Sequence, residues 1–416
     1  MKKIIKHVIP ATLALSLAVT PVMSQAAEFK PSPGNSYAPE VKAKLEDNTM
    51  EYGEIEMLID TYNTTLKNLR DSYGDKKNSM KDVEKVKEQI YSGSEQMLDG
   101  AAQMSSAASQ LEGSIGFGLP IPGLTFAPGT YAELVYNAAV LENQAEQILL
   151  STDQLTEMSP EMMRIQMIDS PRAMMISGAQ SLLIAYENIG LQKKNLQETI
   201  TLAEAGVQTT EHLAAVGMGT WADVNAAKQG LSSAKAGLIT LEANEVNIRQ
   251  QLCNMLGWAY NANPEIPAIP AVDMGRVDSM NLEADTKTAM NNNFTLKYNR
   301  LSEDTLTDGS VQMENLHRTI KAQEAEIATS MVKLYNAVLQ AKSDFYNAQT
   351  TLGQEQMNLA AADRQWTLGM LSKMEYLQAQ NTYHSAETNV RVAELAVLQA
   401  LETYDWAVKG NLALSQ

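Results

Sequence analysis

Two short stretches set the architecture: AVGMGTWADV at 215–224 and LGMLSKME at 368–375. In each, a glycine follows a long segment without proline, and glycine readily takes the left-handed conformation at the end of a helix. A threonine or serine comes three residues after the glycine, and an acidic residue follows three positions later, which is the pattern of an N-cap and capping box. Each stretch therefore predicts a tight turn between two helices.

The flanking segments carry the apolar spacing of long coiled-coil helices. Proline is absent from 173–216 and 313–368, and apolar residues recur at seven-residue steps. In the second arm of the first hairpin, one seam is Val224, Leu231, Leu238 and Leu252. Glu245 interrupts this seam, and its companion is Ala227, Ala234, Leu241 and Ile248. Adding 152 to the residue numbers of the two seams gives Tyr376, Tyr383, Val390 and Tyr404 for the first, and Ala379, Ala386, Ala393 and Ala400 for the second. This recurrence indicates an internal duplication of one long hairpin.

The composition fits long, thin helices better than several thick cores. The 416 residues are 44% hydrophobic but include only five Phe and four Trp, and a single Cys excludes a disulfide scaffold. Asp and Glu number 49 against 32 Lys and Arg, which gives a net charge of -17. This acidity argues against nucleic acid as a partner.

The first 26 residues have the organisation of an export signal. Lys2, Lys3 and Lys6 precede an apolar core at 8–19, and small residues at 24–26 suit cleavage after Ala26. The apolar run is shorter than the ~20 residues that span a bilayer as a helix. We expect the mature chain to leave the cytoplasm.

The sequence of an insertion at about 78–159 predicts a further helical hairpin. Its arms are 80–111 and 131–158, and its tip, 113–130, is the most apolar loop of the chain. The apolar side chains of that loop are Ile115, Phe117, Leu119, Ile121, Leu124 and Phe126. An exposed apolar loop is typical of an element that enters a membrane or forms a cap. The alternative is a loop that folds back onto its own helices.

These features predict six segments. They are a signal peptide (1–26), an N-terminal helical segment of the first repeat (27–77), the inserted hairpin (78–159), the long hairpin of the first repeat (160–258), a linker (259–280) and the second repeat (281–416).

The duplicated pattern resembles the TolC-like outer-membrane efflux protein family. The stretches 173–258 and 313–407 carry the resemblance, and Asn291-Asn292-Asn293 precedes the second copy. The resemblance implies a homotrimer whose long helices form an α-helical barrel around a pore. It also implies two partners, which are a membrane-fusion adaptor protein that meets the hairpin tips and an inner-membrane pump.

The resemblance places functional residues at the two turns. The positions where an adaptor would dock are Gly217, Met218, Thr220, Gly369, Met370 and Ser372. Asp223 and Glu375 fall on acidic positions near the pore entrance, together with Gln378. The chain departs from the family pattern at Gln378, where a second acid would stand, and at Leu371, where an arginine would stand.

The membrane-distal end also departs from the family pattern. The family interrupts each repeat with a pair of strands, and a transmembrane strand needs about 9 to 11 alternating residues. Neither copy offers such a pair. The predicted fold class is all-α, with two repeated long coiled-coil hairpins forming a trimeric α-helical barrel and the inserted helical hairpin in place of β-barrel strands.

Catalytic and metal sites are not indicated. His212, His317 and His384 lack metal-ligand spacing, and no nucleotide-binding or nucleophile-elbow motif appears. One methionine cluster has the soft ligands that suit Cu(I), although methionine at helical spacing is more typical of adaptable packing. Its members are Met162, Met163, Met167, Met174 and Met175. We expect no enzyme activity, no cofactor and no metal.

Two functions remain open. The first is an exported duct of a tripartite efflux or type I secretion system, in the outer membrane or periplasm. The alternative is a non-conducting structural coiled coil of the cell envelope. A duct helix must pack on neighbours at both sides, so its arms should carry two adjacent apolar stripes, whereas a simple rod needs one. The duplicated seams favour the duct.

Overall fold

The computed structural model describes residues 37–78, 91–95, 97–102, 105, 139, 142, 159–304, 306 and 309–414. The signal peptide and the apolar loop from Ile115 to Phe126 lie outside these ranges, as does most of the predicted insertion. Every regular element of the described residues is a helix, apart from an isolated parallel bridge between Thr49 and Glu265. None of the helices searched within these residues is long and apolar enough to cross a membrane.

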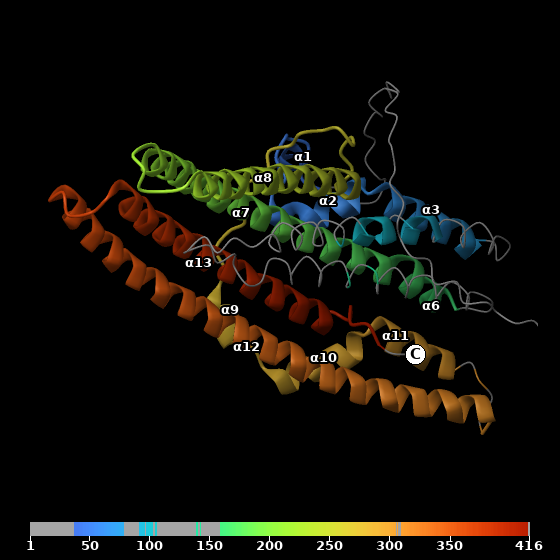
Figure 1. Cartoon of the computed structure of the whole chain (residues 1–416). Helices are drawn as coiled ribbons and strands as arrows, with labels where there is room; N and C mark the ends of the chain where they lie inside the picture. Colours follow the sequence, from blue (N-terminus) through green and yellow to red (C-terminus); the bar gives the residue numbers. More distant parts are fainter. Residues whose placement is uncertain are drawn as a thin grey trace, which may run out of the picture.

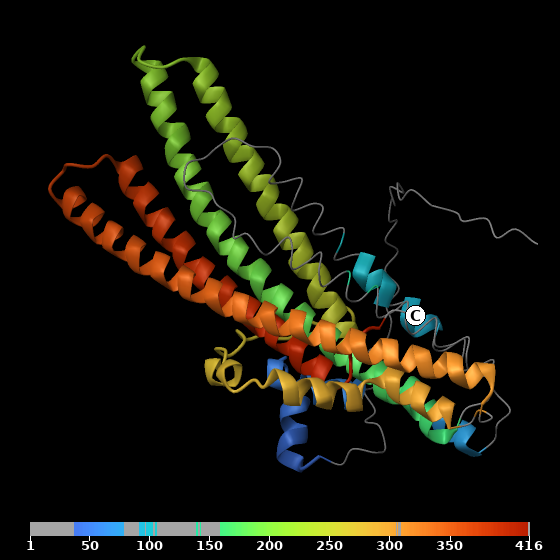
Figure 2. The ribbon, with the colours of Figure 1, turned by 90° about the horizontal axis from the view of Figure 1, so that it is seen from below.

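Two long hairpins dominate the molecule, as the sequence predicts. The first consists of α7 (Ser170–Ala215) and α8 (Trp221–Leu256), and the second of α12 (Val311–Thr367) and α13 (Lys373–Val408). At 1.5 Å per residue, a helix of 57 residues such as α12 is about 85 Å long. Both hairpins point their tips toward the same end of the molecule (Figures 1 and 2).

The four long helices lie side by side in the order α8, α7, α13, α12 (Figure 2). Each arm packs on its hairpin partner, and α7 of the first hairpin packs on α13 of the second. The helices α8 and α12 therefore form the two edges of the array. Within it, α7 and α13 each have a long neighbour on both sides.

The predicted seams face inward. Val224, Leu241, Ile248 and Leu252 are buried on α8, and Ala386 and Tyr404 are buried on α13. Glu245, the interruption of the first seam, forms an ion pair with Lys193 on α7. Seam residues nearer the tips, such as Leu231 and Tyr383, are only half-buried. Burial along the seams is therefore uneven, and Val224 beside the first tip is as fully buried as Leu252 at the base.

The two hairpins meet through polar side chains as well as apolar ones. Ser385 donates its hydroxyl to Asn195 Oδ1 (2.8 Å), and Gln399 Nε2 donates to Ser181 Oγ (3.2 Å). Trp406 Nε1 donates to Gln180 Oε1 at 2.6 Å. The contact between hairpins is therefore more polar than the seams within them.

The linker crosses both hairpins and is tied to them by charge. Glu187 on α7 accepts from the Ile269 amide (2.7 Å) and from Arg391 Nε on α13 (2.7 Å). Glu394, also on α13, accepts from the Val272 amide at 3.1 Å. After this linker segment the chain forms α9 (Met274–Asp278).

A pair of interrupted helices supports each hairpin at its base. In the first repeat, α1 (Pro39–Leu45) and the 3-10 turn Tyr52–Glu54 precede α2 (Ile55–Tyr62) and α3 (Thr64–Asn78). In the second repeat, α10 (Leu282–Asn292) and α11 (Phe294–Glu303) take the same place. One asparagine separates the helices of each pair, Asn63 in the first and Asn293 in the second.

Both asparagines join the interrupted pair to the end of a long helix. Asn63 accepts from the Leu66 amide (2.7 Å) and donates to the Met255 carbonyl (2.7 Å). Asn293 accepts from the Leu296 amide (3.0 Å) and donates to the Leu412 carbonyl (2.9 Å). The duplication therefore extends beyond the hairpins to their bases, and Asn293 belongs to the Asn-rich stretch noted in the sequence.

The first long helix begins with a change of helical pitch. Ser159 caps α6 (Pro160–Arg164), a π-helical turn covers Ile165–Asp169, and Pro171 stands at the start of α7. A π turn is a known way to redirect a helix. The methionine cluster around it is buried, with Met167 fully so. Its methionines pack in the main apolar core, as their helical spacing indicates.

Candidate functional site

The first hairpin tip is a Schellman turn followed directly by a capping box. Gly217 takes a left-handed conformation (φ 76°), and the Met218 amide donates to the Leu213 carbonyl (2.8 Å). Thr220 then caps α8, because its hydroxyl accepts from the Asp223 amide and Asp223 Oδ2 accepts from the Thr220 amide (2.9 Å). This geometry reverses the chain within five residues of coil.

The second tip repeats the first in every element. Gly369 has φ 71°, and the Met370 amide donates to the Gln365 carbonyl (2.9 Å). Ser372 caps α13 and Glu375 Oε2 accepts from the Ser372 amide (2.8 Å). The turns predicted from the glycine and the capping pattern are confirmed at both tips.

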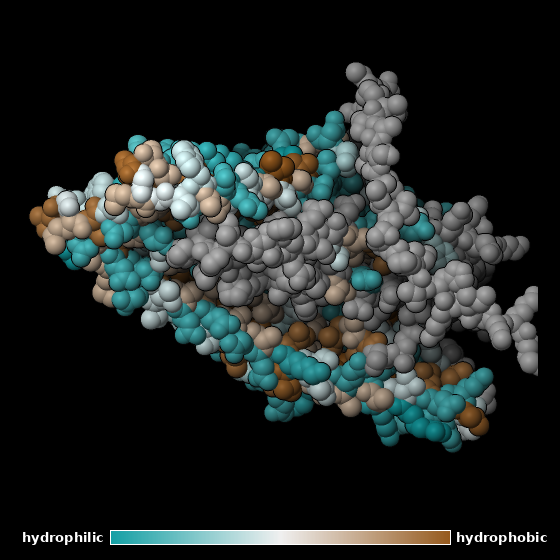
Figure 3. All heavy atoms as spheres, viewed as in Figure 1, coloured by the Kyte–Doolittle hydropathy of each residue, from teal (hydrophilic) through white to brown (hydrophobic). Residues whose placement is uncertain are grey.

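The tips expose apolar side chains at matching positions. Val216 is 68% exposed and Leu368 is 72% exposed, each directly before its glycine. Met218 and Met370, directly after the glycines, are 78% and 71% exposed. Apolar surface gathers at the ends of both hairpins (Figure 3). Exposed apolar clusters at a tight, rigid turn are typical of a protein contact surface.

Each tip is braced behind its apolar end. At the second tip the rings of Trp366 and Tyr376 stack with centroids 5.0 Å apart, and the Tyr376 hydroxyl donates to Asp363 Oδ1 (2.8 Å). At the first tip Lys228 pairs with Glu211 across the hairpin (2.7 Å). The two arms are thus held at a fixed spacing just below each turn.

The two acids assigned to the pore entrance lie in the first turn of the returning helices. Hydrogen bonds from the Thr220 hydroxyl and amide hold the pKa of Asp223 below its usual range. The Ser372 amide and hydroxyl lower the pKa of Glu375 in the same way. Both carboxylates are therefore charged at neutral pH and fix the tip backbone. Gln378 lies one turn further along α13 and is half-buried.

The edges of the array carry a second apolar stripe. On α12 the buried seam includes Met331, Val338 and Phe345. The next residue after each is a large exposed hydrophobic, and Met357 continues the same face. These exposed residues are Val332, Leu339, Tyr346 and Met357, with exposed fractions from 41% to 62%. Since successive residues are about 100° apart on a helix, this stripe lies about 100° around α12 from its buried seam.

The opposite edge has a shorter stripe of the same kind. Ile239 and Val246 are seven residues apart on α8, and they are 67% and 38% exposed. We call these two residues and the four on α12 the edge stripes. These residues are not among the predicted seams, although all but Met357 follow a seven-residue spacing that is visible in the sequence.

Comparisons with known proteins give structural neighbours only. No protein-family model and no curated protein matches the chain. It is similar in structure to CusC (11% identity over 78% of this chain and 97% of that chain, TM-score 0.46). Two further neighbours are the CmeC outer membrane channel of Campylobacter jejuni (13%, 82% and 89%, 0.35) and the outer membrane protein VceC of Vibrio cholerae (12%, 77% and 96%, 0.36). With TM-scores below 0.5 these likenesses carry no functional assignment.

The long helices, the tips and the edge stripes together describe a protein that is built to contact other chains. The described residues form an array of four long helices with two equivalent apolar tips at one end and an exposed apolar stripe at each edge.

Proposed function

We propose that three copies of this chain close into an α-helical duct that passes substrates across the cell envelope, with an adaptor docked at the hairpin tips. The observation that carries the proposal is the pair of edge stripes. An array in which α7 and α13 have long neighbours on both sides, but α8 and α12 have one long neighbour each, has the form of one segment of a ring. Joining α12 of one copy to α8 of the next would bury both stripes.

The closed ring accounts for a feature that a simple rod does not require. A rod needs one apolar seam per helix, and α12 has two adjacent ones, Met331 with Val338 and Val332 with Leu339. The second stripe is exposed to water in one copy, and covering it with the next copy gives the stabilising apolar burial. This observation favours the duct over the non-conducting structural coiled coil.

The tips are the proposed contact with a membrane-fusion adaptor protein, which connects the duct to an inner-membrane pump. Their repeated Val/Leu-Gly-Met geometry would offer an adaptor six equivalent apolar contacts in a trimer. Gly217 and Gly369 contribute by lacking side chains, because a Cβ at either position would have no other atom within 4 Å and would project into the space that an adaptor helix occupies. The proposed location is the outer membrane or periplasm.

Cross-linking between the edges tests the ring. With Ile239→Cys and Met357→Cys in one chain, a short bismaleimide should join α8 of one copy to α12 of the next, and a denaturing gel should show species up to three chains. Either single variant alone should stay uncrosslinked, since the native Cys253 is buried. A double variant that gives only single chains, or a ladder of indefinite length, would refute the closed trimer.

Charge at the tips tests adaptor docking. In the variant Met218→Asp with Met370→Asp we expect at least a tenfold loss of export, with unchanged assembly and melting temperature, because both side chains are exposed and make no core contact. The matched control is Val311→Asp at the opposite end of α12, where Val311 is 72% exposed. Full export by the double tip variant would show that the tips are not the docking surface.

A further inference from the structure

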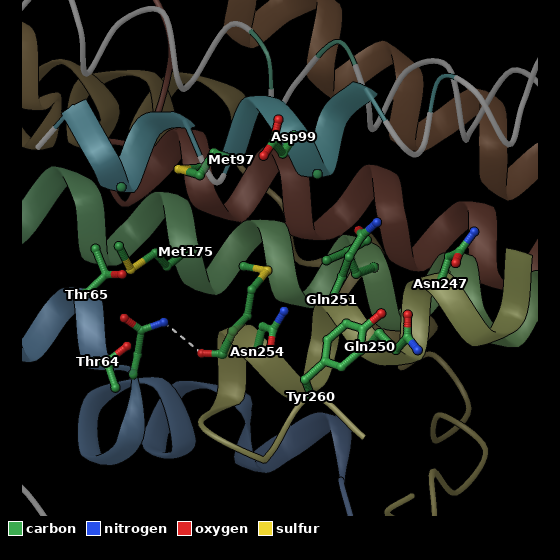
Figure 4. Close-up of a pocket in the computed structure, with 15 residues that line it drawn as sticks. Thr64, Thr65, Met97, Asp99, Met175, Asn247, Gln250, Gln251, Asn254 and Tyr260 are labelled. Atoms are coloured by element: carbon green, nitrogen blue, oxygen red, sulfur yellow. Dashed lines mark hydrogen bonds between the residues drawn. The ribbon is translucent and has the colours of Figure 1, made fainter. Parts of the chain in front are cut away.

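A pocket of about 570 Å³ lies at the base of the first hairpin, away from the tips. It opens between α8, the start of α3, α7 and the short helical segments at 91–95 and 97–102 (Figure 4). Its volume is within the range of small-molecule sites, roughly 300 to 1,000 Å³. Neither the duct nor the adaptor contact proposed above makes use of it.

One wall of the pocket is a stripe of four amide side chains on α8. Asn247, Gln250, Gln251 and Asn254 have the spacing that places residues on one face of a helix, over about 10 Å. Figure 4 shows them along one side of the opening with Thr64 and Thr65 across from Asn254. Each amide offers two N–H donors and a carbonyl acceptor in one plane. The wall is therefore suited to a ligand that has many donors and acceptors and no charge.

The charges around the pocket support this conclusion. Asp99 is the one charged residue among those that line it, and the lining includes no Lys, Arg or His. An anionic ligand would meet the Asp99 carboxylate without a compensating cation. A single carboxylate is also too few ligands for a hard metal ion.

The rest of the lining combines apolar side chains with Asp99, Thr64 and Thr65. Met97, Met175 and Leu182 are buried and contribute to it, and Tyr260 stands exposed beside Gln250 at the rim (Figure 4). Gly100 leaves the stripe open, because a Cβ there would lie 3.9 Å from Gln251 Oε1. A ligand that fills the pocket must present hydrogen-bonding groups on one side and C–H groups on the other.

We propose that this pocket binds an uncharged saccharide that carries acetamido groups. Sugar hydroxyls can both donate to and accept from the side-chain amides. The C–H face of a sugar ring can stack on Tyr260, and the acetamido methyl can pack against Met97 and Met175. The acetamido N–H can donate to the carbonyl of an Asn or Gln side chain, and the acetamido carbonyl can accept from its NH2 group. An extended peptide usually binds at a free sheet edge, and a helical peptide binds in an apolar groove. The amide wall is neither of these, so it does not suit a peptide ligand.

Ligand-detected NMR on the full-length protein tests the site with two β1,4-linked disaccharides that differ only at C2 of each ring, N,N′-diacetylchitobiose (acetamido groups) and cellobiose (hydroxyl groups). We expect saturable binding of the acetylated disaccharide in the millimolar range, and at least tenfold weaker binding of cellobiose. The variant Asn247→Ala with Asn254→Ala should weaken the binding at least tenfold. Both side chains are exposed, so the helix should tolerate alanine.

Two further variants keep the result unambiguous. Asn225→Ala removes an exposed amide from α8 near the tip and should leave the dissociation constant unchanged within twofold. Gly100→Leu should fill the opening and abolish binding without altering α8. No saturable binding of the acetylated probe, equal binding of cellobiose, or binding that survives both pocket variants would overturn the proposal. None of these outcomes depends on whether the chain forms a duct.

Discussion

Gly410→Ala should destabilise the protein by more than about 3 kcal/mol. Gly410 ends α13 with φ 106°, and a Cβ at this position would lie 2.2 Å from the Asn292 carbonyl oxygen. Backbone on both sides must then move, and the Phe294 amide, which donates to the Gly410 carbonyl (3.2 Å), loses its partner. Urea unfolding followed by circular dichroism measures the effect.

The matched control is Gly190→Ala in the middle of α7. A Cβ there has no other atom within 4 Å, and the residue is helical. Alanine should raise the free energy of unfolding by about 0.5 to 1 kcal/mol, because it loses less conformational entropy on folding than glycine. Equal stability of the two variants would show that α13 does not end against α10 as described.

Leu339→Glu should convert the assembly to folded single chains. Leu339 is 41% exposed in one copy, at the centre of the edge stripe on α12, and a carboxylate there would be buried without a partner when the ring closes. Because the side chain lies outside the buried seam of α12, the hairpin itself should keep its helical content. Light scattering and circular dichroism on the same sample separate the two effects.

Ala337→Glu provides the control for this variant. Ala337 is exposed on the same helix, two residues away, on the flank opposite the stripe. The same added charge should leave the oligomeric state unchanged there. A variant at Leu339 that assembles as well as the one at Ala337 would mean that the edge stripe is not an interface.

The hairpins and their turns were predictable because their signals are local. The Schellman glycines, Thr220 with Asp223 and Ser372 with Glu375 lie within a few residues of one another, so spacing alone identifies them. The buried faces followed from the seven-residue period. Which seam residues are only half-buried, such as Leu231 and Tyr383, was not visible, because it depends on the neighbours that each position meets in the folded array.

The bases and the order of the helices were not predictable for a physical reason. Asn63 bonds to Met255, 192 positions away in the sequence, and Asn293 bonds to Leu412, 119 positions away. An asparagine in a polar run gives no sign of such a partner. The contact of α7 with α13 depends partly on polar pairs such as Ser385 with Asn195, which leave no apolar pattern to read. The pocket likewise combines segments far apart in sequence.

The molecular mass of the purified protein in solution decides whether the proposed ring forms. Native mass spectrometry, supported by light scattering at micromolar concentration, should give three chains per particle, because only a closed ring covers the stripes on both α8 and α12. A stable single chain under the same conditions, with the stripes at Ile239 and Leu339 left open to water, would contradict the account.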